Sequence, residues 1–348
     1  MKIKQYIFTC ISLILFSCGT ENNEPNNNPT ENNFGLQKLD QIDFSNTAIN
    51  TVAVDDSSNL WIGTATGLYL LKNEKWYQHP HFNSLTVNTL SVHNNNILIA
   101  TNSGAYSLAL VNNEFSLTDS ITKDLFGGTS DETTAFAYDL YDKMWLGTND
   151  ELAFFDGEKW NRNEKIKNNL GGISAISSMA FRTEDCFFGT YGKYMYHISY
   201  KSQSSVDAIS GASQMLGGAE DPESSFNGEL TTDTVFCVFA GNDGAIWYGS
   251  TAGLTRNIGS TSSYTGDFKY YLRGQRVHSI LEASDGRIWA GTENGLSCLE
   301  GSSWKNYTTS EGLPGDTILS MCEDNDGTIW VGTNKGLSHL SDGIFTNY

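Results

Sequence analysis

Short apolar stretches alternate with polar turns from Asn46 to the end of the chain, and the same order recurs. Each unit has an apolar strand, a turn rich in Asp, Asn and Gly, a second strand of the type Trp-x-Gly-Thr, and then Gly-Leu, which opens a third strand. In the last unit, residues 317–322 predict the inner strand, 324–327 the turn, 328–333 the second strand and 343–348 the fourth. The pattern therefore predicts repeated antiparallel sheets of four short strands.

One small residue in each second strand marks the repeat. The seven copies carry Gly63, Ala100, Gly147, Gly189, Gly249, Gly291 and Gly332. Most are spaced by the roughly 40–45 residues that one propeller blade needs. A sheet that is apolar on both faces is stable only between neighbouring sheets. We therefore predict an all-β protein, a seven-bladed β-propeller of four-stranded antiparallel blades, over residues 36–348.

Tryptophan recurs two residues before the small residue in five of the second strands. These residues are Trp61, Trp145, Trp247, Trp289 and Trp330. A position that repeats in this way favours packing between blades, with the small residue two places on admitting the next blade. The alternative is a ladder of rings on which a sugar stacks.

Three segments carry the repeat most plainly, at residues 242–254, 284–296 and 324–337. They resemble the two-component regulator propeller repeat, and the resemblance extends over roughly residues 45–348. It implies a seven-bladed propeller of the kind that bacterial sensors use as an extracytoplasmic ligand-binding domain, in some cases for oligosaccharides. Because no kinase motif or further domain follows the repeats, we expect binding without a signalling output of its own.

The N-terminus reads as an export signal. Two lysines precede an apolar run over residues 7–16, and the run ends at Leu-Phe-Ser-Cys18, which resembles the lipobox of bacterial lipoproteins. We expect residues 1–17 to be a signal peptide, Cys18 the lipid anchor, and 18–35 a flexible tether rich in Asn, Glu and Pro. The protein is then an outer-membrane lipoprotein facing the periplasm or the cell surface; a plain secretory signal is the alternative.

The net charge and the cysteine spacing limit which partners and metals the protein is expected to bind. A formal net charge of -19 opposes binding to nucleic acid. Cysteines 186, 237, 298 and 322 lack metal-ligand spacing and are expected to be buried free thiols. The segment 324–327 resembles a calcium loop without its downstream Glu, so we expect a turn there, with Ca²⁺ among the acidic loops as the alternative. No other cofactor is expected.

A ligand is expected at one mouth of the central channel, where inner strands begin and long loops converge. The candidate ligand-binding residues are Asn50, Asn88, Thr134, Tyr191, Asp233, Arg273, Arg276 and Asp316. The two arginines favour an acidic sugar, or else neutralise nearby carboxylates. An extension over residues 120–133 reaches the same face, and a longer loop at 219–226 is interpreted as a partial lid or as surface decoration.

Two further functions remain open. An enzyme, a lyase or hydrolase acting on a glycan-like substrate, would need an acid–base pair near His278, and no familiar catalytic motif is present. A protein-interaction scaffold would instead need an exposed apolar patch and a protein partner. We therefore expect a non-enzymatic binding propeller for an oligosaccharide or another small polar ligand. The sequence also leaves undetermined how the ring is closed, and residues 36–44 are a candidate outer strand for the last blade.

Overall fold

The computed structural model describes most of the chain beyond the tether. The described residues are 35–94, 96–111, 114–162, 175–182, 185–191, 195–200, 209–215, 234–258 and 267–348. The expected signal peptide, the anchor Cys18, the loop at 219–226 and Asp233 lie outside this part of the chain.

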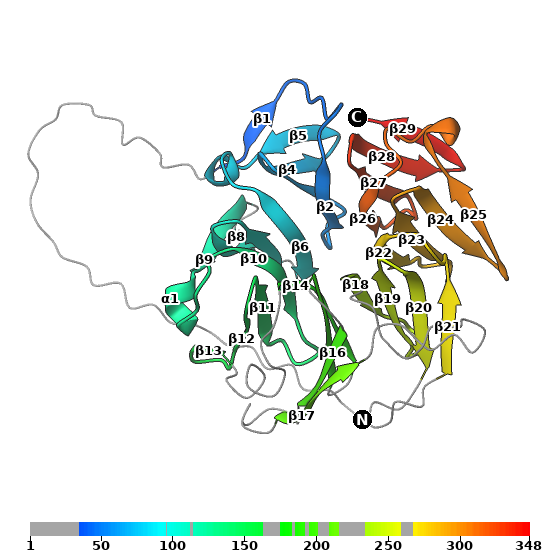
Figure 1. The fold of residues 1–348 in the computed structure, drawn as a ribbon. Coiled ribbons are helices and arrows are strands. Elements are labelled where there is room, and N and C mark those ends of the chain that lie inside the picture. Colours follow the sequence, from blue (N-terminus) through cyan, green and yellow to red (C-terminus); the bar gives the residue numbers. More distant parts are fainter. Residues whose placement is uncertain are drawn as a thin grey trace, which may run out of the picture. The chain divides into compact units, whose positions relative to one another are not determined.

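The described residues form seven antiparallel sheets, one for each predicted repeat (Figure 1). The first three sheets contain β2 (Ile49–Val54), β3 (Leu60–Thr64), β4 (Gly67–Lys72) and β5 (Lys75–Gln78); β6 (Val87–His93), β7 (Asn96–Thr101), β8 (Gly104–Val111) and β9 (Glu114–Ile121); and β10 (Thr133–Tyr138), β11 (Met144–Thr148), β12 (Leu152–Phe155) and β13 (Trp160–Arg162). The next two contain β14 (Ile176–Arg182), β15 (Asp185–Thr190), β16 (Met195–Tyr200) and β17 (Ile209–Met215); and β18 (Val235–Ala240), β19 (Ile246–Ser250), β20 (Gly253–Ile258) and β21 (Asp267–Tyr271). The last two contain β22 (Val277–Glu282), β23 (Ile288–Thr292), β24 (Gly295–Glu300) and β25 (Ser303–Tyr307); and β26 (Ile318–Glu323), β27 (Ile329–Thr333), β28 (Gly336–Ser341) and β29 (Ile344–Asn347).

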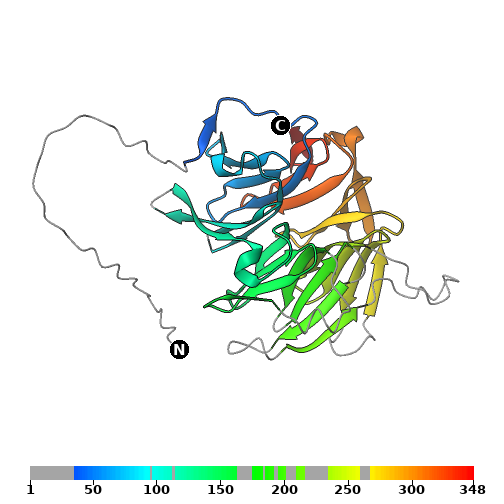
Figure 2. The same ribbon diagram turned by 60° about the vertical axis from the view of Figure 1, so that its left-hand side comes forward.

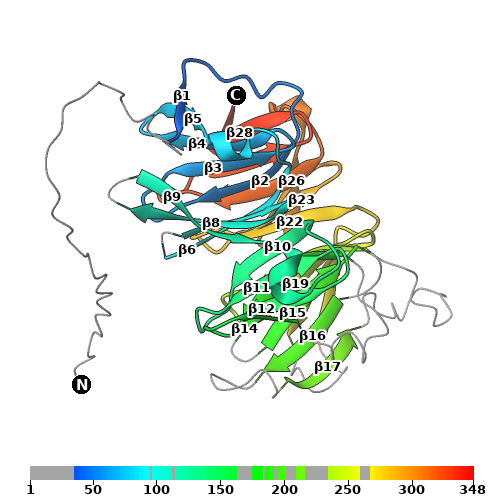
Figure 3. The same ribbon diagram turned by 90° about the vertical axis from the view of Figure 1, so that its left-hand side faces the viewer.

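The sheets are blades of a propeller. Each inner strand contacts the inner strands of both neighbouring blades, and β26 of the seventh blade contacts β2 of the first. The turned views show neighbouring sheets packed face to face (Figures 2 and 3). The short helices are α1 (Lys123–Phe126), η1 (Pro80–Phe82) and η3 (Thr309–Glu311). The predicted seven-bladed all-β fold is confirmed.

The small residue of the repeat admits the next blade, as predicted. A Cβ atom built on Gly63 would lie 2.5 Å from Cγ1 of Val87, the first residue of the next inner strand. The same clash recurs from Gly291 onto Ile318 at 2.7 Å, and from Gly332 onto Ile49 at 2.7 Å. A side chain at this position would therefore push adjacent blades apart, because contacts below 3 Å require displacement of the neighbour.

The repeated tryptophans belong to the core. Trp61 is 0 % exposed, and it clusters with Val87 and Phe115 of the second blade. Trp145 clusters in the same way with Ile176 of the fourth blade. These side chains bury large apolar surfaces between sheets, so they cannot form a sugar ladder. Packing between blades is confirmed.

The ring closes by side-chain contacts between the first and last blades. The amide of Val52 donates to Ser320 Oγ at 3.0 Å, as the amide of Leu90 donates to Thr51 Oγ1 at 3.1 Å between the first two blades. The ring of Tyr348, at the chain end marked C in Figure 1, lies 5.6 Å from Trp76 and 5.6 Å from Trp330. The hydrogen bond that joins neighbouring blades elsewhere thus also joins the two ends of the ring.

The candidate outer strand at residues 36–44 does not pair with the last blade, so that prediction is wrong. Strand β1 (Gln37–Leu39) pairs antiparallel with β5 and gives the first blade a fifth strand. Phe44 then turns inward, 2 % exposed, against Tyr69 and Trp76. Because these rings belong to the first blade, the segment after the tether covers that blade's own outer edge.

Candidate functional site

Each inner strand carries a bulge at its second residue. The register between inner and second strand shifts at this point in all seven described blades. The bulged residues are Asn50, Asn88, Thr134, Ser177, Phe236, His278 and Leu319. A bulge re-aims the side chain of the extra residue out of the regular alternation of the strand. The repeat therefore places seven re-aimed side chains at one end of the channel.

A cavity of about 480 Å³ opens at this end. Its volume lies within the range of about 300–1,000 Å³ that is usual for small-molecule sites. The lining residues are Asn50, Asn88, Thr89, Glu132, Thr134, Asn149, Tyr191, Phe236, His278 and Leu319. Six of the seven bulged residues are among them. The seventh, Ser177, is buried and donates its hydroxyl to the Val235 carbonyl.

The first three blades supply the polar wall. Asn50 Nδ2 donates to the Val87 carbonyl at 3.0 Å, and Asn88 Nδ2 donates to the Thr133 carbonyl at 2.8 Å, so each amide is tied to the next blade. Thr89 Oγ1 donates to the Thr134 carbonyl at 2.8 Å. Each bond uses one donor, so each amide keeps its oxygen and one N–H, while the Thr89 hydroxyl keeps only its lone pairs.

The fourth to seventh blades supply an aromatic and apolar wall. The Phe236 ring lies 4.6 Å from His278 and 6.3 Å from Tyr191, measured between ring centroids. Burial lowers the pKa of His278, and the nearby Glu293 opposes this effect in part while Arg276 adds to it. The imidazole is therefore neutral at pH 7 and extends the stacking surface of Phe236. Leu319 completes this wall.

The extension before the third blade brings a carboxylate to the rim. It contains α1 and runs into β10, and Glu132 Oε2 accepts from Asn149 Nδ2 at 2.6 Å. Asn149 lies in the loop that follows β11. The contact between these two residues joins the extension to the second-strand loop of the third blade.

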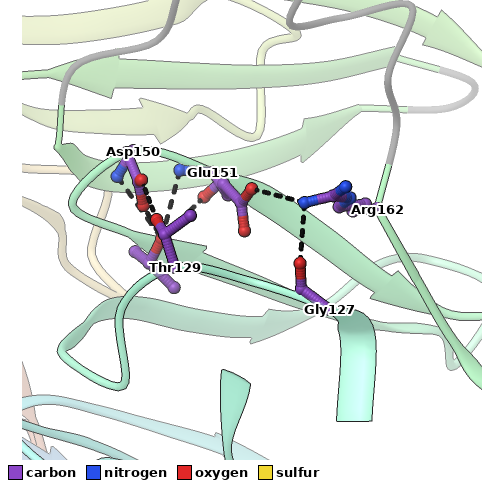
Figure 4. Close-up of polar contacts among 6 residues, drawn as sticks. Gly127, Thr129, Asp150, Glu151 and Arg162 are labelled. Carbon is purple, nitrogen blue, oxygen red and sulfur yellow. Dashed lines mark hydrogen bonds and ion pairs between the residues drawn. The ribbon is translucent and has the colours of Figure 1, made fainter. Parts of the chain in front are cut away.

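Polar contacts fix this extension to the blade (Figure 4). Arg162 Nη1 donates to the Gly127 carbonyl at 2.7 Å and pairs with Glu151 Oε1 at 3.1 Å. The hydroxyl of Thr129 donates to the Asp150 carboxylate. Glu151 stands where the first and sixth blades have Gly67 and Gly295, so those two blades lack the carboxylate that forms this ion pair. It holds the segment that carries Glu132 against the loop that carries Asn149.

Four predicted site residues meet in the cavity: Asn50, Asn88, Thr134 and Tyr191. The other described candidates do not line it. Arg276 is 3.9 Å from Glu293, the guanidinium of Arg273 lies over the Tyr270 ring, and the Asp316 carboxylate accepts from the Thr309 amide at 2.7 Å.

Sequence reasoning missed Glu132, Asn149, Phe236 and Leu319 as lining residues and considered His278 only for catalysis. In the later blades it chose polar residues just before the inner strand, such as Asp316 before β26, whereas the second residue of the strand faces the cavity. Counting back from the small residue of each repeat would have put Asn50, Phe236 and His278 in one column. Glu132 and Asn149 carry no such signal.

No cluster of three or more His, Cys, Asp and Glu side chains suited to a metal is present in the described ranges. The segment expected as a turn is one, since Asp324 Oδ1 accepts from the backbone amides of Asp326 and Thr328, both at 3.0 Å. The cysteines of the described blades are free, and burial raises the pKa of Cys237 to about 12. No described helix is long and apolar enough to cross a membrane.

Two stretches of the chain match a known repeat. The family model described as "Two component regulator propeller" matches residues 271–294 and 312–335, which contain the inner and second strands of the sixth and seventh blades. This agrees with the resemblance drawn from the Trp-x-Gly-Thr motif. A search of the curated proteins finds no match.

Solved structures share the fold. The extracellular domain of a hybrid two-component system from B. thetaiotaomicron matches with a TM-score of 0.65 and 17 % identity, over 88 % of this chain and 39 % of that one. A second such domain from B. thetaiotaomicron matches with a TM-score of 0.63 and 20 % identity, over 88 % and 41 %. The chain thus spans about two fifths of these domains.

A virginiamycin B lyase from Staphylococcus aureus, solved in an inactive form with quinupristin, also matches. Its TM-score is 0.58 and its identity 15 %, over 86 % of this chain and 96 % of the lyase. The same propeller architecture thus occurs in extracellular domains of two-component systems and in an enzyme. Function has to be argued from the side chains of the cavity.

Proposed function

We propose that this protein is an extracytoplasmic binding propeller that takes a small polar ligand, such as an oligosaccharide, at the bulged end of its channel. The observation that carries the proposal is the division of the cavity wall. Acceptor side chains of Asn50 and Asn88 line one side, and the rings of Phe236 and Tyr191 line the other. A sugar ring has the matching division, because its hydroxyls project from the edge while its C–H groups form an apolar face.

The proposed location outside the cytoplasm rests on the N-terminal sequence. The apolar run ending at Cys18 favours export and acylation, and the Asn-rich tether would hold the propeller away from the lipid. Its fold likeness to extracellular domains of two-component systems agrees with this assignment. In this proposal the protein is attached to the outer membrane through its lipid anchor alone.

A glycan array followed by calorimetry on the full chain tests the binding function. We expect at least one oligosaccharide class to bind, and Phe236→Ala to weaken that binding about tenfold, since an aromatic contact contributes about 0.5–1.5 kcal/mol beyond its buried area. Ile344→Ala, which removes an apolar side chain that is 68 % exposed on β29, is the matched control and should bind normally. An unaltered affinity in Phe236→Ala would contradict the proposed site.

A catalytic role is the second candidate, and one observation favours it. His278 lines the cavity with a pKa lowered by burial, so its neutral imidazole is available as a base, and Glu132 is the carboxylate on the polar wall. The test is incubation of the binding glycans with the protein and with His278→Gln. Product formed by the parent protein and absent with the variant would establish an enzyme, whereas binding without product would leave the binding propeller.

A further inference from the structure

The polar wall of the cavity is richer in acceptors than in donors. An N–H of Asn50, Asn88 and Asn149 and the hydroxyl hydrogens of Thr89 and Thr134 are all donated to protein oxygens. What these side chains keep for a ligand is dominated by amide oxygens and hydroxyl lone pairs. A ligand that brings donors fits this wall better than one that brings acceptors.

The charge of the described lining residues is negative, which also favours a ligand that brings donors. Glu132 adds a carboxylate whose second oxygen is not used by Asn149, and no Lys or Arg is among the described lining residues. Arg276, the basic side chain just before β22, is 58 % exposed and lies beside Glu293. The chain as a whole carries a formal net charge of -19, which raises the local concentration of cations.

The aromatic wall also accommodates a cation. The faces of Phe236 and Tyr191 attract an ammonium group through the quadrupole of each ring, and the same faces stack on sugar C–H groups. An acidic sugar would instead place its carboxylate among acceptor oxygens with no positive side chain to receive it. The arginines that suggested such a sugar from the sequence do not line this cavity.

We propose that the cavity selects ligands that carry a primary ammonium group, as in an amino sugar with a free amine, with Glu132 as the residue that sets this preference. This inference rests on the proposed binding function and specifies its ligand class. The ammonium group would donate to Glu132 and to the amide oxygens of Asn50 and Asn88, while the ring of the sugar lies on Phe236.

Calorimetry on the full chain with three disaccharides tests the inference. The probes are the disaccharide of glucosamine, its N,N′-diacetylated form, and a disaccharide containing glucuronic acid. We expect the free amine to bind about two- to tenfold more tightly than the acetylated form, and the acidic probe to bind most weakly. Because Glu132 is exposed at the rim, the preference should shrink as salt is added.

The decisive variant is Glu132→Gln, which keeps an oxygen to accept from Asn149 while removing the charge. It should abolish the preference for the amine, so that the free amine and the acetylated probe bind with similar affinity. Glu300→Gln, which removes a charge from an exposed residue at the end of β24, should retain the preference.

The outcomes separate the two proposals. Equal or stronger binding of the acetylated or acidic probe, lost in Phe236→Ala, would overturn the ammonium preference and keep the binding function. An amine preference that survives Glu132→Gln would also overturn the inference. Failure of all three probes to bind would overturn the inference as stated, and the binding function would fall only if the wider glycan array were also empty.

Discussion

The indole nitrogen of Trp61 donates a hydrogen bond to the Asp55 carboxylate at 3.0 Å. Asp55 occupies the first position of the turn between β2 and β3, and its other oxygen accepts from the backbone amides of Ser57 and Asn59. The third and seventh blades repeat the contact, from Trp145 at 2.9 Å and from Trp330 at 3.0 Å. In each of these three blades one aspartate thus links the turn to the tryptophan of the core.

Removal of that carboxylate should be costly. Asp55→Ala leaves the indole N–H of Trp61 and two turn amides without their acceptor, so we expect a loss of about 2–4 kcal/mol in the free energy of unfolding. Chemical denaturation measures this loss. Ser57→Ala, at an exposed position of the same turn whose backbone amide is retained, is the control and should change stability by less than about 0.5 kcal/mol. A similar stability for the two variants would show that the contact is not important.

The sixth blade offers the converse experiment. Ala283 occupies the aspartate position, because its amide donates to the Arg287 carbonyl in the same way as the Asp55 amide donates to the Asn59 carbonyl. The indole nitrogen of Trp289 is buried without a partner among the described atoms. Ala283→Asp should supply the missing acceptor and stabilise the protein by about 1 kcal/mol. Ala283→Leu, of similar shape without an acceptor, should not. Thermal unfolding compares the two, and an equal or lower Tm for the aspartate variant would refute the equivalence of the blades.

Ring closure depends on the space above Gly332. Gly332→Ala places a methyl group 2.7 Å from Ile49 Cγ2 and 2.9 Å from the Ile49 carbonyl, so we expect a loss of about 1–3 kcal/mol in unfolding free energy. Replacing glycine with alanine by itself stiffens the unfolded chain and stabilises by about 0.4–1 kcal/mol, so a net loss isolates the clash. Urea denaturation of the variant is the measurement. A gain in stability would mean that the first and last blades can move apart to admit the methyl group with no loss of unfolding free energy.

His79 makes stability depend on pH. Its side chain is 0 % exposed, neither ring nitrogen has a partner among the described atoms, and burial lowers its pKa from 6.5 to about 4, with a smaller effect from His81. Between these two values the unfolded chain binds the proton and the folded protein does not. The contribution of neutral His79 is therefore complete above pH 6.5 and is lost as pH falls toward 4, about 3 kcal/mol in all.

The variant His79→Leu removes this titration. Denaturation at pH 7.5 and at pH 4.5 should show a smaller fall in stability for His79→Leu than for the parent protein. His81→Leu, at the exposed neighbouring histidine, should retain most of the parent's fall. Equal pH dependence in the parent and in His79→Leu would assign the acid sensitivity to other groups, such as His278 or His339, whose pKa values burial also lowers.

Much of the fold could be predicted from local sequence. The repeat of strand, turn and Trp-x-Gly-Thr determined the blade count, the strand order and the burial of residues such as Trp61, because alternation and turn chemistry act within a few residues. The small residue in each second strand determined that sheets would approach closely. These predictions held in blades whose motif is degenerate, including the blade of Ala100.

The tertiary structure decided what faces the ligand. A bulge at the second residue of each inner strand turns Phe236 and His278 into the cavity, whereas the polar residues ahead of the strand, such as Asp316, are used in loop contacts. Side-chain direction at a bulge depends on the register with the neighbouring strand, which a linear pattern does not contain. The pairing of β1 with β5 and the contact of Glu132 with Asn149 are likewise long-range choices, made when separate segments meet around the closed ring.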